Sequence, residues 1–388
     1  MTRLSRRHFA LACAAIASTL AAAPLLAQDK GEIVVGATVP ITGAFAASGA
    51  QYYNSLRLAQ DDINAAGGIH GRKLRIAFED TTANNSAAVN AFVKLVKQYN
   101  PPFIFLSSLS TQDMAMEPEV AKAKIPTMFA GGAVAIQERK NPYMFRIRPV
   151  DDLASVAMAS GIVEALKKKK PGILYAQDDY GTGASASLEA LLVKQGLTLA
   201  GKESFSPRDN DFSAQLLSLK NKGADVLVTF NYNRDGALIL KQRKSLGIDL
   251  PLVAGTGMAA PATLNLVDAD DLQGVYVISD TILGEAISPA SADFVRRYAV
   301  AYKMRPDSYG AAYYDAALIL ADALRKVGTD PEKLRAHLAG LKNFKGIART
   351  YSNDTATNNM AHSVVLANFK PGTKDTVAVE TSSRPVKP

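Results

Sequence analysis

The sequence predicts an α/β protein made of two similar lobes, each with a mostly parallel sheet flanked by helices. The chain has 388 residues, which favours two domains over one. Strand and helix signals alternate from Glu32 onward, and this order favours parallel strands joined by right-handed crossovers. The alternation starts again near Asp151, with no low-complexity linker between the two series. We therefore expect lobes that the chain crosses several times, rather than two independent domains.

The first series combines short apolar strands with helices that carry apolar residues at helical spacing. Val89, Phe92 and Val96, for example, lie on one face of a helix. The preceding helix ends at Gly67-Gly68. We expect strands at residues 33–35, 73–78, 102–106 and 127–129, and helices at residues 51–65 and 87–98.

The second series repeats this order. Asp151 or Asp152 is expected to start its first helix, which carries apolar residues from Leu153 to Leu166. Further strands are expected at residues 172–176, 224–230, 252–253 and 274–277. Further helices are expected at residues 184–194, 235–246, 292–302 and 308–327.

The first 27 residues have the organisation of an export leader. Arg6-Arg7 precedes an Ala-rich apolar stretch, which ends at small residues before the polar Gln28. Paired arginines indicate a twin-arginine export address. The apolar stretch is too short and too weakly apolar for a stable membrane span. We predict a cleaved leader over residues 1–27 and a mature protein in the periplasm.

Composition excludes several classes of function. The chain is 48% apolar and 21% charged, as in ordinary globular proteins. Its net charge is +8, and removing the three arginines of the acid-free leader leaves 8 − 3 = +5. The one dense basic run, residues 167–170, is typical of a solvated helix end, so we expect no nucleic-acid partner. Cys13 lies in the leader, so the mature chain has no disulfide and no thiolate chemistry.

Two glycine-rich segments, residues 181–186 and 255–260, look like dinucleotide-binding fingerprints. Asp178-Asp179-Tyr180 separates the first segment from its strand, however, so its glycines are not in the required tight turn. The sequence has no nucleophile elbow and no phosphate-binding loop. The mature histidines, His70, His337 and His362, lack metal-ligand spacing. We expect no cofactor, no metal and no catalysis.

A serine-rich segment follows the third strand and starts a helix. Ser110 and Asp113 have capping-box spacing, which leaves Ser107 and Ser108 free for another role. The carboxyl end of a parallel strand, beside the free N–H groups of a helix, is where open α/β sheets bind anions. We expect Ser108 to contact a ligand, with turn formation as the alternative.

Three tyrosines stand in loops or helix starts of both lobes: Tyr180, Tyr232 and Tyr309. Tyrosine combines apolar surface with a polar tip, which suits a small amphipathic ligand. Each of them could belong to a core, but together they predict an aromatic cleft.

Residues 62–72 (Asp62-Ile63-Asn64-Ala65-Ala66-Gly67-Gly68-Ile69-His70-Gly71-Arg72) resemble a signature of leucine/isoleucine/valine-type periplasmic binding proteins of ATP-binding-cassette (ABC) importers. Residues 179–183, 211–216 and 314–317 resemble further runs of that family, and the resemblance covers about residues 31–370. It implies a two-lobed type I periplasmic-binding-protein fold with three hinge crossings. It also implies a small-molecule ligand and an importer permease in the inner membrane as partners, with the binding protein a monomer.

The resemblance also implies roles for single residues. Ser108 matches the serine that holds the ligand carboxylate, and Leu106 and Ser107 match the pocket backbone before it. Gly131 and Ala133 match positions that contact the α-carboxylate and the amine of an amino acid. Tyr180, Tyr232 and Tyr309 match aromatic pocket positions.

This sequence departs from the family pattern at three of these positions. It has Ala133 where amino-acid binders often have threonine, Thr256 where they often have an acid, and Ser48 in place of an aromatic residue. A buried ammonium without a carboxylate partner is costly. We therefore predict that an aromatic or other amine-free carboxylate competes with aliphatic amino acids as ligand, unless Asp178, Asp179 or backbone carbonyls accept the amine.

We expect ligand to bridge the lobes and to close them about crossings near residues 148–151, 277–280 and 345–350. This divides the chain into lobe 1 (residues 31–149 and 280–346) and lobe 2 (residues 150–279 and 347–388). Two alternatives remain open. The first is an extracytoplasmic ligand sensor, and the second is an exported cofactor-binding enzyme.

Overall fold

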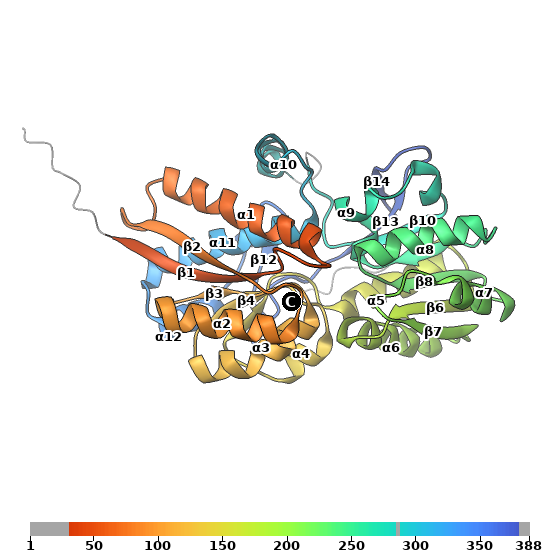
Figure 1. The fold of residues 1–388 in the computed structure, drawn as a ribbon, viewed down its shortest axis with the longest axis horizontal. Helices are drawn as coiled ribbons and strands as arrows, with labels where there is room; N and C mark the ends of the chain where they lie inside the picture. The colour runs from red at the N-terminus through yellow and green to blue at the C-terminus, as the bar shows by residue number, and fades with distance from the viewer. Residues whose placement is uncertain (1–30, 285–287, 380–388) are drawn as a thin grey trace, which may run out of the picture.

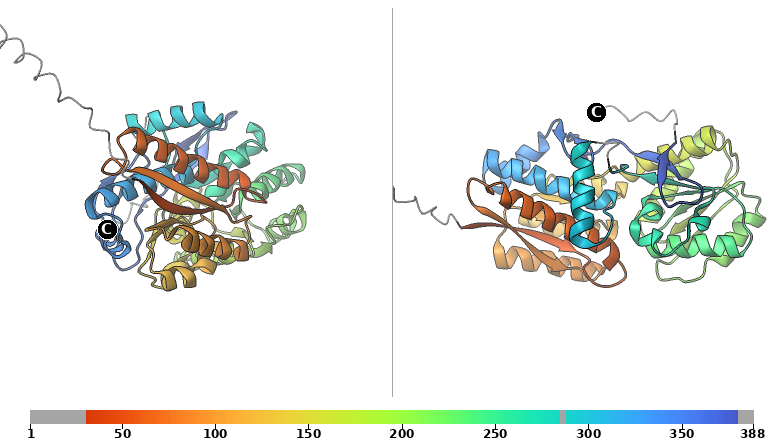
Figure 2. Two further views of the ribbon diagram at one scale, coloured as in Figure 1. Left: turned by 60° about the vertical axis from the view of Figure 1, so that its left-hand side comes forward. Right: turned by 90° about the horizontal axis from the view of Figure 1, so that it is seen from above.

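The computed structural model describes residues 31–284 and 288–379, so the predicted leader lies outside the described part. Two α/β lobes lie side by side along the long axis of the molecule (Figure 1). Seen from above, in the right-hand view of Figure 2, the two lobes are again separate bodies joined by a few chain segments. Among the described residues, no helix has the length and apolar character needed to cross a membrane.

Lobe 1 contains a five-stranded parallel sheet in the order β2-β1-β3-β4-β5. Its strands are β1 (Glu32–Val39), β2 (Lys73–Asp80), β3 (Ile104–Phe105), β4 (Thr127–Phe129) and β5 (Met144–Arg146). Its helices are α1 (Ala46–Ala65), α2 (Asn85–Tyr99), α3 (Ser110–Ala123), α4 (Val134–Glu138), α10 (Pro289–Tyr302), α11 (Ser308–Val327) and α12 (Pro331–Ala339). A short hairpin, β11 (Phe344–Lys345) with β12 (Thr350–Tyr351), completes the lobe.

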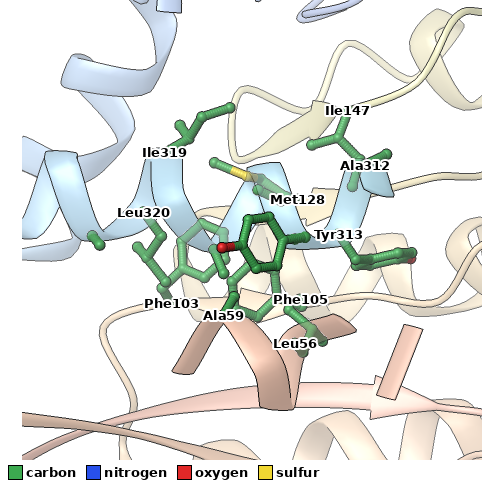
Figure 3. Packing of buried hydrophobic residues seen from close by; sticks show 14 of the residues in the cluster. Leu56, Ala59, Phe103, Phe105, Met128, Ile147, Ala312, Tyr313, Ile319 and Leu320 are labelled. Carbon is green, nitrogen blue, oxygen red and sulfur yellow. The ribbon is translucent and has the colours of Figure 1, made fainter. Parts of the chain in front are cut away.

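Helices cover both faces of the lobe 1 sheet. On one face, α1 and α11 pack side chains such as Leu56 and Tyr313 against Phe105 and Met128 of the strands (Figure 3). On the other face, α2 and α3 contribute a second cluster, with Phe92 fully buried. Strands buried on both faces read as continuous apolar runs, which is why β1 and β3 could be recognised from sequence.

Lobe 2 contains a seven-stranded sheet in the order β14-β13-β10-β9-β8-β6-β7, parallel except at β13 and β14. Its strands are β6 (Pro171–Ala176), β7 (Gly201–Phe205), β8 (Val226–Phe230), β9 (Leu252–Ala254), β10 (Val275–Ser279), β13 (Val365–Phe369) and β14 (Thr376–Ala378). Its helices are α5 (Asp151–Ser160), α6 (Asp179–Lys194), α7 (Ser213–Asn221), α8 (Asn233–Ser245) and α9 (Pro261–Leu264). One cluster packs α5 and α6 on the sheet, and another packs α7 and α8.

The chain passes between the lobes three times, and the third passage lies later than the sequence predicts. The first follows β5 near Arg148, and the second follows β10 near Asp280. Residues 347–361 were expected in lobe 2, but Ile347, Tyr351 and Ala361 belong to the core of lobe 1. The third crossing therefore lies between Ala361 and β13.

The carboxylate of Asp315 on α11 explains this difference. It accepts hydrogen bonds from the amides of Ile347 (2.7 Å) and Ala348 (3.0 Å) and from the hydroxyl of Tyr351 (3.0 Å). Because these donors lie 32 to 36 residues further along the chain, no local pattern predicts that this segment stays in lobe 1.

Candidate functional site

A cavity lies between the lobes, where the carboxyl ends of strands from both sheets meet. Its lining comes from both lobes, and it surrounds about 540 Å³ of unfilled space, part of it open to solvent. The lining residues are Phe45, Ser48, Tyr52, Ser108, Leu109, Ser110, Gly132, Arg148, Tyr180, Asn231, Tyr232, Asn233, Thr256, Gly257, Ala260, Asp307 and Tyr309.

Six residues predicted from sequence line this cavity. Ser108, half-buried, lies between the end of β3 and the start of α3, and its hydroxyl donates a hydrogen bond to the Tyr52 hydroxyl oxygen. At the start of a helix the first amides have no carbonyl four residues back to bond, so the first turn of α3 attracts anions. The other five predicted residues are Ser48, Tyr180, Tyr232, Thr256 and Tyr309.

The aromatic rings of the lining lie close together. The rings of Tyr180 and Tyr232, both in lobe 2, have centroids 5.5 Å apart. Phe45 of lobe 1 meets Tyr232 edge to face at 4.7 Å. Tyr309 lies 6.1 Å from Tyr52 on the lobe 1 side. These rings provide an apolar surface with hydroxyl groups at its edge.

Two hydrogen bonds join the lobes directly across the cavity. The side-chain amide of Asn233 donates to the Ser48 hydroxyl at 2.8 Å. The hydroxyls of Thr256 and Tyr309 lie 2.8 Å apart. The two lobes therefore touch on the cavity side, and the structure is a closed form.

Four predicted site residues do not line the cavity, because their polar groups are already bonded inside lobe 1. Leu106 is buried, and its carbonyl accepts from the Tyr313 hydroxyl at 2.6 Å. Ser107 is fully buried, and its hydroxyl accepts from the Leu109 amide. The amides of Gly131 and Ala133 donate to the side chains of Asp113 and Ser110.

The last two bonds also show that the expected capping box is wrong. The N-cap of α3 is Leu109, without a side-chain cap, and Ser110 is already helical. Ser110 and Asp113 instead hold the loop after β4 against α3, at 3.2 and 3.0 Å from the amides of Ala133 and Gly131. Gly132, within that loop, lines the cavity in place of its two predicted neighbours.

Sequence reasoning missed Arg148 as a lining residue and predicted it only as a hinge. Its guanidinium donates to both carboxylate oxygens of Asp280, at 2.8 and 3.0 Å, and lies 3.3 Å from Asp151. The same group lies 4.9 Å from the centroid of the Tyr309 ring. Neighbouring Asp280 and Asp151 raise the pKa of Arg148, against the opposing effect of burial, so it stays charged. A hinge arginine thus forms part of the cavity wall.

Asp307 is the second residue that sequence reasoning missed. It is the N-cap of α11, and its carboxylate accepts from the Gly310 amide at 2.7 Å. Burial raises its pKa to about 7. No motif marks this residue, since an aspartate before a helix is explained by capping alone.

Asp178, offered from sequence as an acceptor for an amine, is already engaged. It caps α6 by accepting from the Gly181 amide at 2.9 Å and accepts from the Tyr232 hydroxyl at 2.7 Å. It lines an outer cavity at the other side of Tyr232, whereas Asp179 is exposed. Neither acid lines the inner cavity.

Comparison with known families shows to which protein family the chain belongs. The model of the periplasmic binding protein family matches residues 32–375. The chain belongs to this family. Membership confirms the resemblance drawn from residues 62–72 and the related runs, and it places the chain among exported solute-binding proteins.

Individual members of the periplasmic binding protein family are similar over most of their length. The chain is 30% identical to "Leu/Ile/Val-binding protein homolog 8" of Brucella abortus over 337 residues, 82% of each chain. An isoleucine complex of a branched-chain amino acid transporter substrate binding protein from Streptococcus pneumoniae has a TM-score of 0.82 at 23% identity, over 90% of this chain and 99% of that chain. A benzoate complex of an ABC transporter solute binding protein from R. palustris has a TM-score of 0.81 at 19% identity, over 92% and 98%. These likenesses confirm the two-lobed type I fold.

Within residues 31–284 and 288–379, no group of three or more His, Cys, Asp or Glu side chains could hold a metal ion. What the cavity offers is hydrogen-bond donors, ring faces and two charged groups.

Proposed function

We propose that this protein is the substrate-binding component of an ABC importer and that it captures a small carboxylate with an apolar body. In this proposal a twin-arginine leader exports it, it acts as a monomer in the periplasm, and it binds without catalysis. The observation that carries the proposal is the position of Ser108 and the first turn of α3, opposite the rings of Tyr180 and Tyr232.

The carboxylate end is recognised by lobe 1. The Ser108 hydroxyl can turn from Tyr52 toward a ligand oxygen, and the first-turn amides of α3 supply further donors. Charge-assisted hydrogen bonds of this kind are stronger than neutral ones. Arg148, in the same wall, adds positive potential, although Asp280 balances most of it.

The apolar body of the ligand lies against the aromatic side of the cavity. Rings of Tyr180 and Tyr232 come from lobe 2, and Tyr309 and Phe45 come from lobe 1, so one ligand can contact both lobes. Relatives of this fold are described with isoleucine or with benzoate, two carboxylates with apolar bodies. We therefore place the ligand in this class.

Ligand binding favours closure of the two lobes. A ligand held between Ser108 and Tyr232 adds contacts that exist only when the lobes meet, so it favours the closed form. We propose that the permease recognises this closed form.

Thermal-shift and calorimetric titrations of the mature chain test the proposal. The probes are leucine, isoleucine, benzoate and 4-hydroxybenzoate, with leucinamide and benzamide as matched compounds that lack the carboxylate. We expect at least one acid to raise the melting temperature while its amide does not, because a ligand of the native state alone stabilises it. Equal responses to an acid and its amide would contradict carboxylate recognition.

A further inference from the structure

Among the described residues that line the cavity between the lobes, here called the inner cavity, Arg148 is the one basic residue and Asp307 the one acidic residue. They differ in how well the charge of each is balanced. Arg148 is paired with both oxygens of Asp280. The Asp307 carboxylate accepts from neutral backbone amides, that of Gly310 at 2.7 Å and that of Tyr309, and among the described residues it takes part in no ion pair.

Asp307 has the position that an amine acceptor needs. It is half-buried, and it lines both the inner cavity and the groove beside Arg305 and Pro306. Ser108 lines the same cavity and donates a hydrogen bond to the Tyr52 hydroxyl, and burial, followed by the charge of Asp307, raises the pKa of Tyr52. An α-amino acid whose carboxylate lies at Ser108 therefore has an acidic group within the same cavity for its ammonium.

We propose that Asp307 is the acceptor for a ligand's amino group and thereby decides whether this protein takes amino acids or amine-free acids. This inference rests on the proposed function, since it assumes that a carboxylate ligand occupies the cavity. It assigns to an N-cap residue the role that neither Ala133 nor Thr256 can fill.

The charge state of Asp307 determines the direction of the effect. Ionised Asp307 attracts an ammonium group and repels a ligand whose only charge is a carboxylate. Burial raises its pKa to about 7, so the residue changes charge near neutral pH. Neutral Asp307 loses the attraction to the amine and no longer repels the acid.

Among the titratable groups around Asp307, Asp307 itself is the one whose pKa is placed near 7. Tyr52 of α1 and Tyr298 of α10 face it, and burial raises the pKa of both phenols above their usual value of 10.0. Asp280 of the second crossing adds to the effect of burial in raising the pKa of Asp307, and its carboxylate accepts hydrogen bonds from Arg148. Tyr309, next in sequence, also has its pKa raised by burial, to about 12.

Pairs of ligands that differ only in the amine test this inference. We use leucine with 4-methylpentanoate and phenylalanine with 3-phenylpropanoate, titrated calorimetrically from pH 5 to 8.5. For the wild type, the affinity ratio of amino acid to amine-free acid rises with pH through about 7, since ionisation of Asp307 favours only the amine-bearing member.

The decisive variant is Asp307→Asn, which removes the charge and keeps an N-cap that can accept from Gly310. We expect the affinity ratio to fall at least about tenfold at pH 8 and to lose its pH dependence. Asp330→Asn is the matched control, because Asp330 caps the neighbouring helix α12 by the same kind of bond to Lys333. It should leave the ratio unchanged.

Failure of this inference is distinct from failure of the proposed function. If Asp307→Asn binds each pair with the wild-type ratio at every pH, the assignment of Asp307 is wrong while carboxylate binding stands. If the wild type binds neither acid of either pair, both the proposed function and this inference are overturned. If the affinity ratio falls as much in Asp330→Asn as in Asp307→Asn, the assignment of Asp307 is also wrong, because Asp330 does not line the cavity and cannot contact the ligand.

Discussion

Ser108 combines two properties that a ligand-binding residue needs. Its side chain is half-buried at the cavity wall, and its hydrogen bond goes to Tyr52, a neutral partner that a charged ligand can replace. Ser107, one residue earlier, is fully buried and bonded to the Leu109 amide. Ser107 is therefore bonded within the turn, whereas Ser108 lines the cavity.

Replacing Ser108 by alanine should weaken binding of carboxylates without unfolding the protein. A hydrogen bond to a charged group contributes roughly 1.5–3 kcal/mol. Calorimetric titration with a carboxylate that binds the wild type measures the loss. Ser245→Ala, an exposed serine at the end of α8, is the control and should bind as the wild type does. Unchanged affinity in Ser108→Ala would remove this residue from the site.

Asp315, in contrast to Ser108, belongs to a run that resembles the family but has a structural role. Its buried carboxylate accepts three hydrogen bonds from residues 347–351. Asp315→Ala leaves two amides and a phenol without their partner, which should lower the free energy of unfolding by about 3 kcal/mol.

Urea unfolding measures this effect. Asp322→Ala on the same helix removes a half-exposed acid paired with Lys326, and its cost should stay below about 1 kcal/mol. Equal stability of the two variants would show that the three bonds contribute little.

At the scale of the element, glycines that look like a cofactor motif serve helix packing. Gly181 and Gly183 lie inside α6, which begins at Asp179 rather than at Ala184 as expected. A Cβ on Gly181 would lie 2.1 Å from the Ala176 carbonyl oxygen, whereas one on Gly183 would meet no atom within 4 Å. In the second segment, a Cβ on Gly255 would lie 2.6 Å from the Tyr180 hydroxyl. Gly181 and Gly255 therefore allow α6 and Tyr180 to approach the strand ends, whereas Gly183 has no packing role.

The two glycines of α6 should respond oppositely to alanine. Gly181→Ala must displace the end of β6 or the start of α6 and should destabilise the protein by about 1–3 kcal/mol. Gly183→Ala should stabilise it by roughly 0.5–1 kcal/mol, because alanine loses less conformational entropy in a helix. Thermal and urea unfolding of both variants check this, and destabilisation by Gly183→Ala would contradict the packing argument.

At the scale of the whole molecule, hydrogen bonds link the three crossings. Arg148 of the first crossing binds the Asp280 carboxylate of the second. Arg349 donates to the Asp280 carbonyl at 2.7 Å and to the Ser363 carbonyl of the third crossing at 3.2 Å. Because Arg148 also lines the cavity, the hinge network forms part of the cavity wall.

Asp280→Asn tests this network. It leaves the buried Arg148 charge without its main partner, which should cost about 3–5 kcal/mol of stability. The control is Asp375→Asn, which breaks the exposed interlobe pair with Arg305 and should cost less than about 1 kcal/mol. Unfolding of both variants gives the difference, and radii of gyration from small-angle scattering show whether the lobes separate. If both variants lose a similar free energy of unfolding, the buried pair of Arg148 and Asp280 contributes no more to stability than the exposed pair.

The sequence by itself determined the features that depend on short-range patterns. Alternating apolar strands and amphipathic helices predicted the two parallel sheets, and strand β4 was placed at its observed bounds. The edge strand β7 was missed because its residues, mostly half-buried, carry no apolar run. Aromatic residues after strands predicted the cleft tyrosines, because strand ends meet at one edge of a parallel sheet.

The tertiary structure decided which polar groups remain free for a ligand. Gly131 and Ala133 are near the site, but Asp113 and Ser110 already use their amides, and no pattern along the chain reveals such saturation. Arg148 and Asp307, 159 residues apart (307 − 148), line one cavity only because the chain returns to lobe 1 after the second crossing. The charge balance of the cavity therefore depends on long-range contacts that residue spacing does not encode.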